Sequence, residues 1–339
     1  MQDSRVKTFC YVKRSLHTII TLFIFLFFFS CEREPKNIKL SGQVFGTSYS
    51  VIYDNDTNFE KEFDSLFYMI NKSMSTYIEN SDISKLNRNE AVEVDEHFVN
   101  VYKTSRTIFN ETKGAFDPTI GAVVNAWDFG PEGKIVALDS LKIDSLMLSV
   151  GLDKVKLRSN TILKENLNTY LDFNAIAKGY AVDVIAQFLD SQNITDYLVE
   201  IGGEINSKGI NREKQNPWRV GIDEPNFDGS QSVIKAIILE DEAMATSGTY
   251  RKFKVDENGN RYAHIIDTKT GYPSKTNVLS VSVIANDCMT ADAYATAFQA
   301  MGIEKVTELL KTHPELKVFF IFENKNNELE TLALNGFPE

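Results

Sequence analysis

Apolar side chains recur every three to four residues in several stretches of the chain, the spacing that places them along one face of an α-helix. In residues 59–74 this repeat is carried by Phe59, Phe63, Leu66, Phe67 and Ile70. Further helices are predicted over residues 98–112, 138–150, 175–189 and 291–301. Asn174 is positioned to cap the start of the fourth helix, and Gly302 to end the fifth.

Other stretches have the alternating or short apolar pattern that predicts β-strands. They cover residues 43–53, 197–201, 218–222, 234–239, 278–285 and 318–322. The second of these runs directly into Gly202-Gly203. Helices and strands are interleaved without the regular alternation of a doubly wound parallel sheet, so the predicted fold class is α+β.

The N-terminal segment has a different pattern from the rest of the chain. Four basic residues precede an apolar run over residues 19–29, which suits the core of an export signal and is short for a transmembrane helix. The run ends in Ser30-Cys31, which resembles a bacterial lipoprotein signal with Cys31 as the lipidated residue. We therefore expect residues 1–30 to be a cleaved signal peptide, residues 31–40 a tether and residues 41–339 one domain. An uncleaved N-terminal anchor is the alternative.

Charge and cysteine content fit an exported protein. The formal net charge is −11, and removing residues 1–30, with four basic residues and one acidic residue, makes it −14. A body this acidic excludes nucleic acid as a natural partner and is weakly attracted to anionic lipid, so a lipid chain would supply the anchoring. Only Cys31 and Cys288 would remain, and a lipidated Cys31 rules out an internal disulfide. The expected location is the bacterial cell envelope, on the inner membrane facing the periplasm or on the outer membrane.

Residues 172–179 combine small side chains with a predicted helix start, where free N–H groups favour an anion. Lys178 lies in the first turn, an electrostatically unfavourable place for a cation unless a bound phosphate offsets it. A packed helix start with a solvated lysine is the alternative.

Residues 289–296 carry Asp292 and Thr296 four positions apart, so both side-chain oxygens lie on one helical face. A carboxylate, a hydroxyl and nearby carbonyls suit a hard cation such as Mg²⁺. The alternative is an aspartate that favours the helix dipole beside a buried threonine.

Hydroxyl groups and glycines gather in residues 245–251 and 262–271, as they would around a phosphate or a ribose. His264 lies in the second segment, where it is either a base or ligand or a structural histidine. His97 and His313 stand in polar surroundings and are expected at the surface. Tyr77 could stack on a flat ring or belong to the core. Asp117, in a turn before Pro118, is by default a turn-stabilising residue.

The order of these segments is more informative than any one of them. Over about residues 40–325 the chain resembles the ApbE family of FAD:protein FMN transferases. The resemblance is carried by Phe45-Gly46-Thr47, Met74-Ser75-Thr76-Tyr77, Ser84-Lys85-Leu86-Asn87, residues 114–119 with 127–130, residues 172–179, Ile201-Gly202-Gly203-Glu204, and residues 245–251, 264–271 and 291–296.

The resemblance implies mixed sheets with packed helices and an FAD site in a cleft between two lobes. It implies a metal, Mg²⁺ or possibly Mn²⁺, held by the carbonyl of Ala175 and by Asp292 and Thr296. His264 is similar to a histidine proposed as the general base, and Asp292 is the other candidate for that role. The implied FAD contacts are Phe45, Tyr77 as the stacking aromatic, Phe116, Asp117, Asp172, Lys178 and, more weakly, Ile266.

Three positions depart from the family's usual pattern. Phe45 stands where methionine is common, Asn174 where glycine or serine is frequent, and Thr268 where proline is usual. None of them removes an implied metal ligand.

The implied reaction is transfer of FMN from FAD to a serine or threonine hydroxyl of an acceptor protein, with release of AMP. The implied acceptor is a subunit of a membrane redox complex or another exported flavoprotein. An FAD pyrophosphatase that releases FMN and AMP, and a non-catalytic FAD-binding lipoprotein, are the alternatives.

Overall fold

The computed structural model describes residues 37–250, 252–255 and 261–339. The predicted signal peptide and Cys31 lie outside the described residues. Residues Asn37–Glu339 form one compact unit. In these ranges no helix combines the length and the apolar character needed to cross a lipid bilayer.

An eight-stranded sheet organises this unit, and every neighbouring pair in it is antiparallel. Its spatial order is β1 (Asn37–Val44), β2 (Thr47–Asp54), β5 (Tyr197–Ile201), β6 (Glu204–Lys208), β11 (Ala243–Gly248), β14 (Val278–Ala285), β15 (Lys317–Glu323) and β16 (Leu329–Leu334). All eight residues of β14 are buried, because this strand is covered on both faces. Its alternating sequence pattern predicted the strand correctly, and the structure shows that Ser280 and Ser282 are buried as well.

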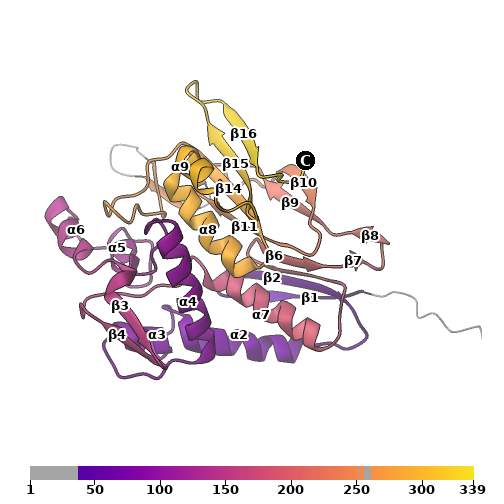
Figure 1. Cartoon of the computed structure of the whole chain (residues 1–339), viewed down its shortest axis with the longest axis horizontal. Helices are drawn as coiled ribbons and strands as arrows, with labels where there is room; N and C mark the ends of the chain where they lie inside the picture. The colour runs from indigo at the N-terminus through magenta and orange to yellow at the C-terminus, as the bar shows by residue number, and fades with distance from the viewer. Residues whose placement is uncertain (1–36, 251, 256–260) are drawn as a thin grey trace, which may run out of the picture. The chain divides into compact units, whose positions relative to one another are not determined.

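Helices cover one face of the sheet. They are α2 (Glu60–Met74), α3 (Asp82–Asn87), α4 (Glu96–Glu111), α7 (Ala177–Ser191), α8 (Cys288–Met301) and α9 (Ile303–Leu309). The helices α7 and α8 lie against the sheet and against each other, and α2 and α4 pack on them (Figure 1). The main core is enclosed between this layer and the inner face of the sheet, where Val51, Val199 and Val283 are fully buried.

Smaller elements cover the other face and one edge. The hairpin of β9 (Arg219–Asp223) and β10 (Val233–Ile238) packs Val220, Ile222 and Ile237 on the outer face of the sheet. A separate apolar cluster joins α5 (Gly121–Ala126) and α6 (Ser140–Met147) to Ile266. The remaining elements are β3 (Val155–Arg158) with β4 (Thr161–Lys164), β7 (Ile210–Asn211) with β8 (Asn216–Pro217), β12 (Phe253–Val255) with β13 (Arg261–Ala263), and the short 3₁₀ helix η1 (Leu152–Lys154).

The α+β prediction is confirmed, and all five predicted helices are present with shifted ends. Residues 43–53 were wrongly predicted as one strand, because Phe45 and Gly46 both have positive φ angles (51° and 74°) and form the two-residue turn of the β1–β2 hairpin. The first strand begins at Asn37, so the last residues of the expected tether belong to the sheet. Asn174 does not cap α7, whose first turn begins after Ile176.

Candidate active site

A cavity of about 1260 Å³ opens between the helical layer and the ends of the central strands. It is lined by the β1–β2 turn, the end of α2, the loop before α5, the starts of α7 and β6, and one face of α8. Every described residue that the sequence analysis selected as a site candidate lines this cavity: Phe45, Tyr77, Phe116, Asp117, Asp172, Ala175, Lys178, His264, Ile266, Asp292 and Thr296. Arg251, in one of the selected segments, lies outside the described residues.

The cavity wall depends on a very close approach of α7 to α8. A Cβ atom at Gly179 would lie 2.3 Å from the carbonyl oxygen of Cys288 and 2.8 Å from Cβ of Asp292. Only glycine permits backbone contact at this distance. The Gly179 N–H donates to Oδ2 of Asp292 at 3.0 Å, which fixes the carboxylate beside Lys178 on the neighbouring helix.

The start of α8 is held by two further aspartates. Asp183, buried on α7, accepts hydrogen bonds from the backbone N–H groups of Cys288 (2.9 Å) and Met289 (2.8 Å). Asp287 caps the helix by accepting from the backbone N–H of Thr290 at 2.8 Å. Acidic groups at a helix N-terminus satisfy its free N–H groups and favour its dipole. Together these contacts set the position of Asp292 one turn further along.

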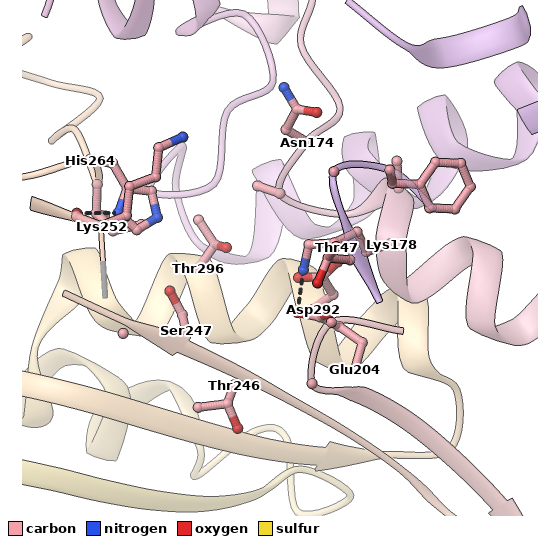
Figure 2. A pocket seen from close by; sticks show the side chains of 18 of the residues that line it. Thr47, Asn174, Lys178, Glu204, Thr246, Ser247, Lys252, His264, Asp292 and Thr296 are labelled. Atoms are coloured by element: carbon pink, nitrogen blue, oxygen red, sulfur yellow. Dashed lines mark hydrogen bonds and ion pairs between the residues drawn. The ribbon is translucent and has the colours of Figure 1, made fainter. Parts of the chain in front are cut away.

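Three charged groups meet at this point of the wall, as Figure 2 shows for Lys178, Glu204 and Asp292. Lys178 forms an ion pair with Oε1 of Glu204, which lies at the start of β6. Burial raises the pKa of Glu204 to about 7, although Lys178 opposes that rise. Burial also raises the pKa of Asp292. Burial lowers the pKa of Lys178, but Glu204 and Asp292 outweigh it and hold the pKa above the ordinary value of lysine.

Glu204 belongs to the motif of residues 201–204, but the sequence did not predict it as a site residue. It lies 26 positions from Lys178 in the sequence, and the β5–β6 hairpin brings the two together. An acidic residue directly after Gly202-Gly203, at the end of an apolar strand, is the sequence signal that could have identified it.

His264 occupies the other side of the cavity from this charged group, with Thr296 and Ser247 between them in Figure 2. Its Nδ1 lies 3.0 Å from the carbonyl oxygen of Lys252, an arrangement in which Nδ1–H donates and Nε2 is left as the acceptor. Its ring meets Phe129 with 6.2 Å between centroids. Burial, together with the charges of Lys252 and Lys178, lowers the pKa of His264 to about 4, so the ring is neutral at neutral pH.

The other two histidines among the described residues, His97 and His313, do not line the cavity. They were expected at the surface, but both are half-buried. His97 shares a hydrogen bond with the hydroxyl of Tyr180 (2.8 Å), and His313 lies 3.1 Å from Glu315.

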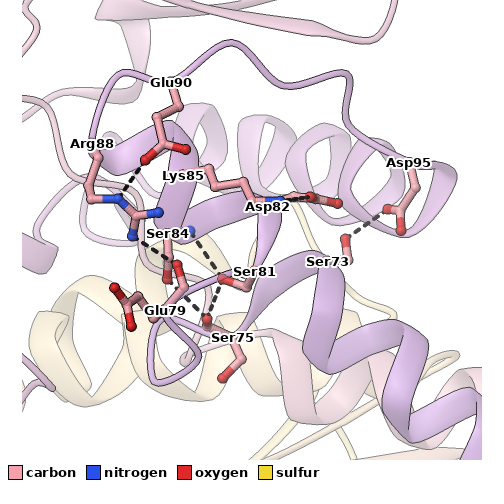
Figure 3. Close-up of polar contacts among 10 residues, drawn as sticks. All are labelled: Ser73, Ser75, Glu79, Ser81, Asp82, Ser84, Lys85, Arg88, Glu90 and Asp95. Carbon is pink, nitrogen blue, oxygen red and sulfur yellow. Dashed lines mark hydrogen bonds and ion pairs between the residues drawn. The ribbon is translucent and has the colours of Figure 1, made fainter.

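Tyr77 lines the cavity with 61% of its surface exposed. It is therefore not a core residue. The loop that carries it is held by α3 (Figure 3). The hydroxyls of Ser81 and Ser84 donate to the carbonyl of Ser75 at 2.7 and 3.3 Å, and Arg88 donates to the carbonyl of Glu79 at 2.8 Å. The exposed ring thus belongs to a loop that several hydrogen bonds hold in place.

The loops before α5 and α7 each contribute a carboxylate that lines the cavity and also stabilises its own loop. Oδ1 of Asp117 accepts from the N–H (2.9 Å) and the hydroxyl (2.6 Å) of Thr119, so it does stabilise the turn as its sequence context suggested. Burial raises the pKa of Asp117 to about 6 and also raises that of Asp172. Asp172 accepts from the N–H of Asn174 at 2.7 Å, and this bond, rather than a helix cap, is the local role of Asn174. Phe116 is almost fully buried.

The polar groups around Asp292 fit a hard cation. The carboxylate of Asp292, the hydroxyl of Thr296 and residue Ala175 all line the same cavity. The described residues contain no cluster of three His, Cys, Asp or Glu side chains suited to a metal ion. A site built from one carboxylate, one hydroxyl and a backbone carbonyl does not require such a cluster, and Mg²⁺ commonly completes its shell with water and substrate phosphates.

A model of the ApbE family matches residues 45–320. The chain belongs to the ApbE family. It is 38% identical over 299 residues to an FAD:protein FMN transferase of Vibrio cholerae, covering 85% of this chain and 88% of that one. It is 36% identical over 331 residues to the corresponding protein of Haemophilus influenzae, covering 93% and 95%.

Solved structures agree with this ApbE membership. The flavin transferase ApbE from Vibrio cholerae superposes with a TM-score of 0.79 at 35% identity, covering 88% of this chain and 97% of that one. The apo flavinyl transferase ApbE from Pseudomonas stutzeri also gives 0.79, at 26% identity, covering 89% and 96%.

The fold accommodates the three departures from the ApbE pattern. Phe45 packs edge-on against Phe67 with 5.6 Å between centroids, so part of its ring joins the core. Asn174 is exposed and its side-chain amide lies 3.4 Å from the hydroxyl of Thr76. Thr268 donates its hydroxyl to the carbonyl of Gly114, a bond that proline could not make.

Proposed function

We propose that this chain transfers FMN from FAD to a serine or threonine hydroxyl of an acceptor protein and releases AMP. The observation that carries the proposal is that eleven residues predicted from the sequence line one cavity in a chain of the ApbE family. The volume of this cavity exceeds the usual range for small-molecule sites, so it is large enough for a dinucleotide.

The acceptor oxygen attacks the phosphorus on the FMN side of the pyrophosphate. A new phosphorus–oxygen bond forms to the acceptor, the bond to the AMP phosphate breaks, and AMP leaves with the bridging oxygen. The acceptor proton passes to a base. The product is a phosphodiester between the flavin and the protein.

Lys178 supplies a fixed positive charge for the phosphate oxygens, on which charge accumulates in the transition state. Its raised pKa keeps it protonated throughout the physiological range. Tyr77 offers an exposed aromatic face to the isoalloxazine ring. Such stacking orients the substrate but raises the rate only through positioning.

A divalent cation, Mg²⁺ or possibly Mn²⁺, would be held by Asp292, Thr296 and the carbonyl of Ala175. When bound, it would neutralise phosphate charge and polarise the phosphorus. The buried carboxylate of Asp292 supports this assignment, because a buried charge needs partners and, among the described residues, its one hydrogen bond comes from the N–H of Gly179.

His264 and Asp292 are the two candidates for the base. His264 is neutral and presents Nε2 as an acceptor, which suits proton uptake. Asp292 would be engaged by the cation, which favours His264.

We also propose that the chain is exported and anchored through a lipid on Cys31, with the acceptor a subunit of a membrane redox complex or another exported flavoprotein. The support is the pattern of residues 1–31. Radiolabelled palmitate should label the full chain, and Cys31→Ser should abolish the label. Labelling that survives this change would contradict the anchor.

The transferase is tested with the purified chain, FAD, Mg²⁺ and an acceptor that carries a flavinylation site. The expected result is equal amounts of AMP and covalently labelled acceptor. Free FMN with AMP would indicate a pyrophosphatase, and stoichiometric FAD binding without AMP would indicate a storage protein.

A further inference from the structure

Glu204 has a carboxylate that the protein itself only half satisfies. The residue is 3% exposed, and Oε1 pairs with Lys178. Its Oε2 is buried without a hydrogen-bond partner among the described residues. A buried carboxylate oxygen without a partner is costly, so the negative charge of Glu204 needs positive charge nearby to compensate it.

The backbone preserves this arrangement. A Cβ at Gly202 would lie 3.4 Å from Oε2 of Glu204 and 2.8 Å from Cγ2 of Thr47. Gly202 also has a φ of 65°, which favours glycine. Glycine at position 202 therefore suits the close packing of this turn between Thr47 and the Glu204 carboxylate.

The local charges explain why a second carboxylate is needed. Asp292 alone would be balanced by Lys178, so a divalent cation at Asp292 would enter a neutral site beside an ammonium group. With Glu204 ionised, the three side chains carry a net charge of −1. Both carboxylates raise the pKa of Lys178, Lys178 lowers the pKa of each carboxyl group, and Asp292 raises the pKa of Glu204, so the three side chains are electrostatically linked.

We propose that Glu204 is the counter-charge that allows Lys178 and a divalent cation to occupy adjacent positions on the cavity wall. Its carboxylate holds the ammonium group through Oε1 and strengthens cation binding at Asp292. Glu204 is thus a positioning residue for the site. The inference rests on the cation of the proposed function.

Removing the charge of Glu204 and removing the charge of Lys178 should change the affinity for Mn²⁺ in opposite directions. Glu204→Gln removes a negative charge and should weaken Mn²⁺ binding about 10- to 100-fold, the scale typical of residues that support a metal ligand. Lys178→Met removes the opposing positive charge and should strengthen it. The double variant should return to within about threefold of the wild type, because the two charge changes cancel.

Mn²⁺ binding to the full chain is measured from the electron paramagnetic resonance signal of the free ion. The pH is 8, so that Glu204 is mostly ionised. Glu204→Asp keeps the negative charge, so its Mn²⁺ affinity should stay within about threefold of the wild type. Glu200→Gln is the matched control on the same hairpin, because Oε1 of Glu200 accepts from the N–H of Gly203 at 2.8 Å instead of pairing with Lys178. It should leave the affinity within about threefold.

Unchanged binding in Glu204→Gln would overturn the inference, as would an equal loss in Glu200→Gln. A double variant as weak as Glu204→Gln would also overturn it, because the effect would then be structural. If the wild type itself binds no Mn²⁺, the cation of the proposed function fails and the inference fails with it. Thermal unfolding of each variant checks that the fold is intact.

Discussion

Replacing Gly179 by alanine tests whether the contact between α7 and α8 is required for both fold and catalysis. The added Cβ would lie 2.3 Å from the carbonyl oxygen of Cys288, whereas non-bonded heavy atoms pack best at roughly 3.5–4 Å. The obstacle is backbone, which cannot rotate away as a side chain can. The two helices must therefore separate by about 1 Å.

Two opposing effects decide the change in unfolding free energy. Crowding of a packed interior costs about 1–3 kcal/mol, and a backbone obstacle belongs at the upper end of that range. Alanine in place of glycine inside a helix stabilises by about 1 kcal/mol. The expected net result is a loss of about 1–2 kcal/mol. A shift of about 1 Å between Lys178 and Asp292 should also lower turnover about 10²-fold.

Urea unfolding and FMN transfer measure the two effects. Gln187 supplies the matched control, because it is exposed on α7. There the change from glycine to alanine, measured between Gln187→Gly and Gln187→Ala, should be stabilising by about 1 kcal/mol. If Gly179→Ala is as stable as the wild type or more so, the two helices do not constrain each other as described.

Three further predictions concern titratable groups in and near the site. Asp183→Asn should lower the unfolding free energy, measured with urea at pH 8, by about 2–3 kcal/mol. The single oxygen of an amide cannot accept the hydrogen bonds from both N–H groups at the start of α8, as the two carboxylate oxygens do. An unchanged value would refute that role. Asp292→Ala, or chelation of divalent cations, should abolish transfer while the protein stays folded, and full activity under either condition would contradict the metal assignment. His264→Ala should slow transfer about 10²-fold. Because burial lowers the pKa of His264 to about 4, this base is lost only as the pH falls towards 4, so the acid limb of kcat/KM that depends on His264 should lie near 4. A limb near pH 6.5 that disappears in His264→Ala would contradict the neutral ring.

Much of the helical layer could be predicted because its helices bury one apolar face. The strands were harder to predict where their sequences lack an alternating apolar pattern. The small residues of β11 and the polar residues of β6 are held in place by their neighbours rather than by their own β-propensity. The turn at Phe45 was missed because phenylalanine rarely adopts a positive φ, and only the pairing of β1 with β2 imposes it.

The candidate site shows the same division. Asp292 and Thr296 could be paired from helical spacing alone, and both do line the cavity. The ion pair between Lys178 and Glu204 joins a helix to a hairpin, and no local pattern encodes such a contact. The roles of the site residues in FAD and metal binding stay predictions until they are measured.

The most direct test of the central claim is mass spectrometry of envelope proteins from cells that carry the wild-type chain or the Asp292→Ala variant. A peptide with FMN joined to serine or threonine through a phosphodiester should be present with the wild type and missing with the variant. The same flavinylated peptides in both cells, or in neither, would contradict transfer of FMN to protein by this chain.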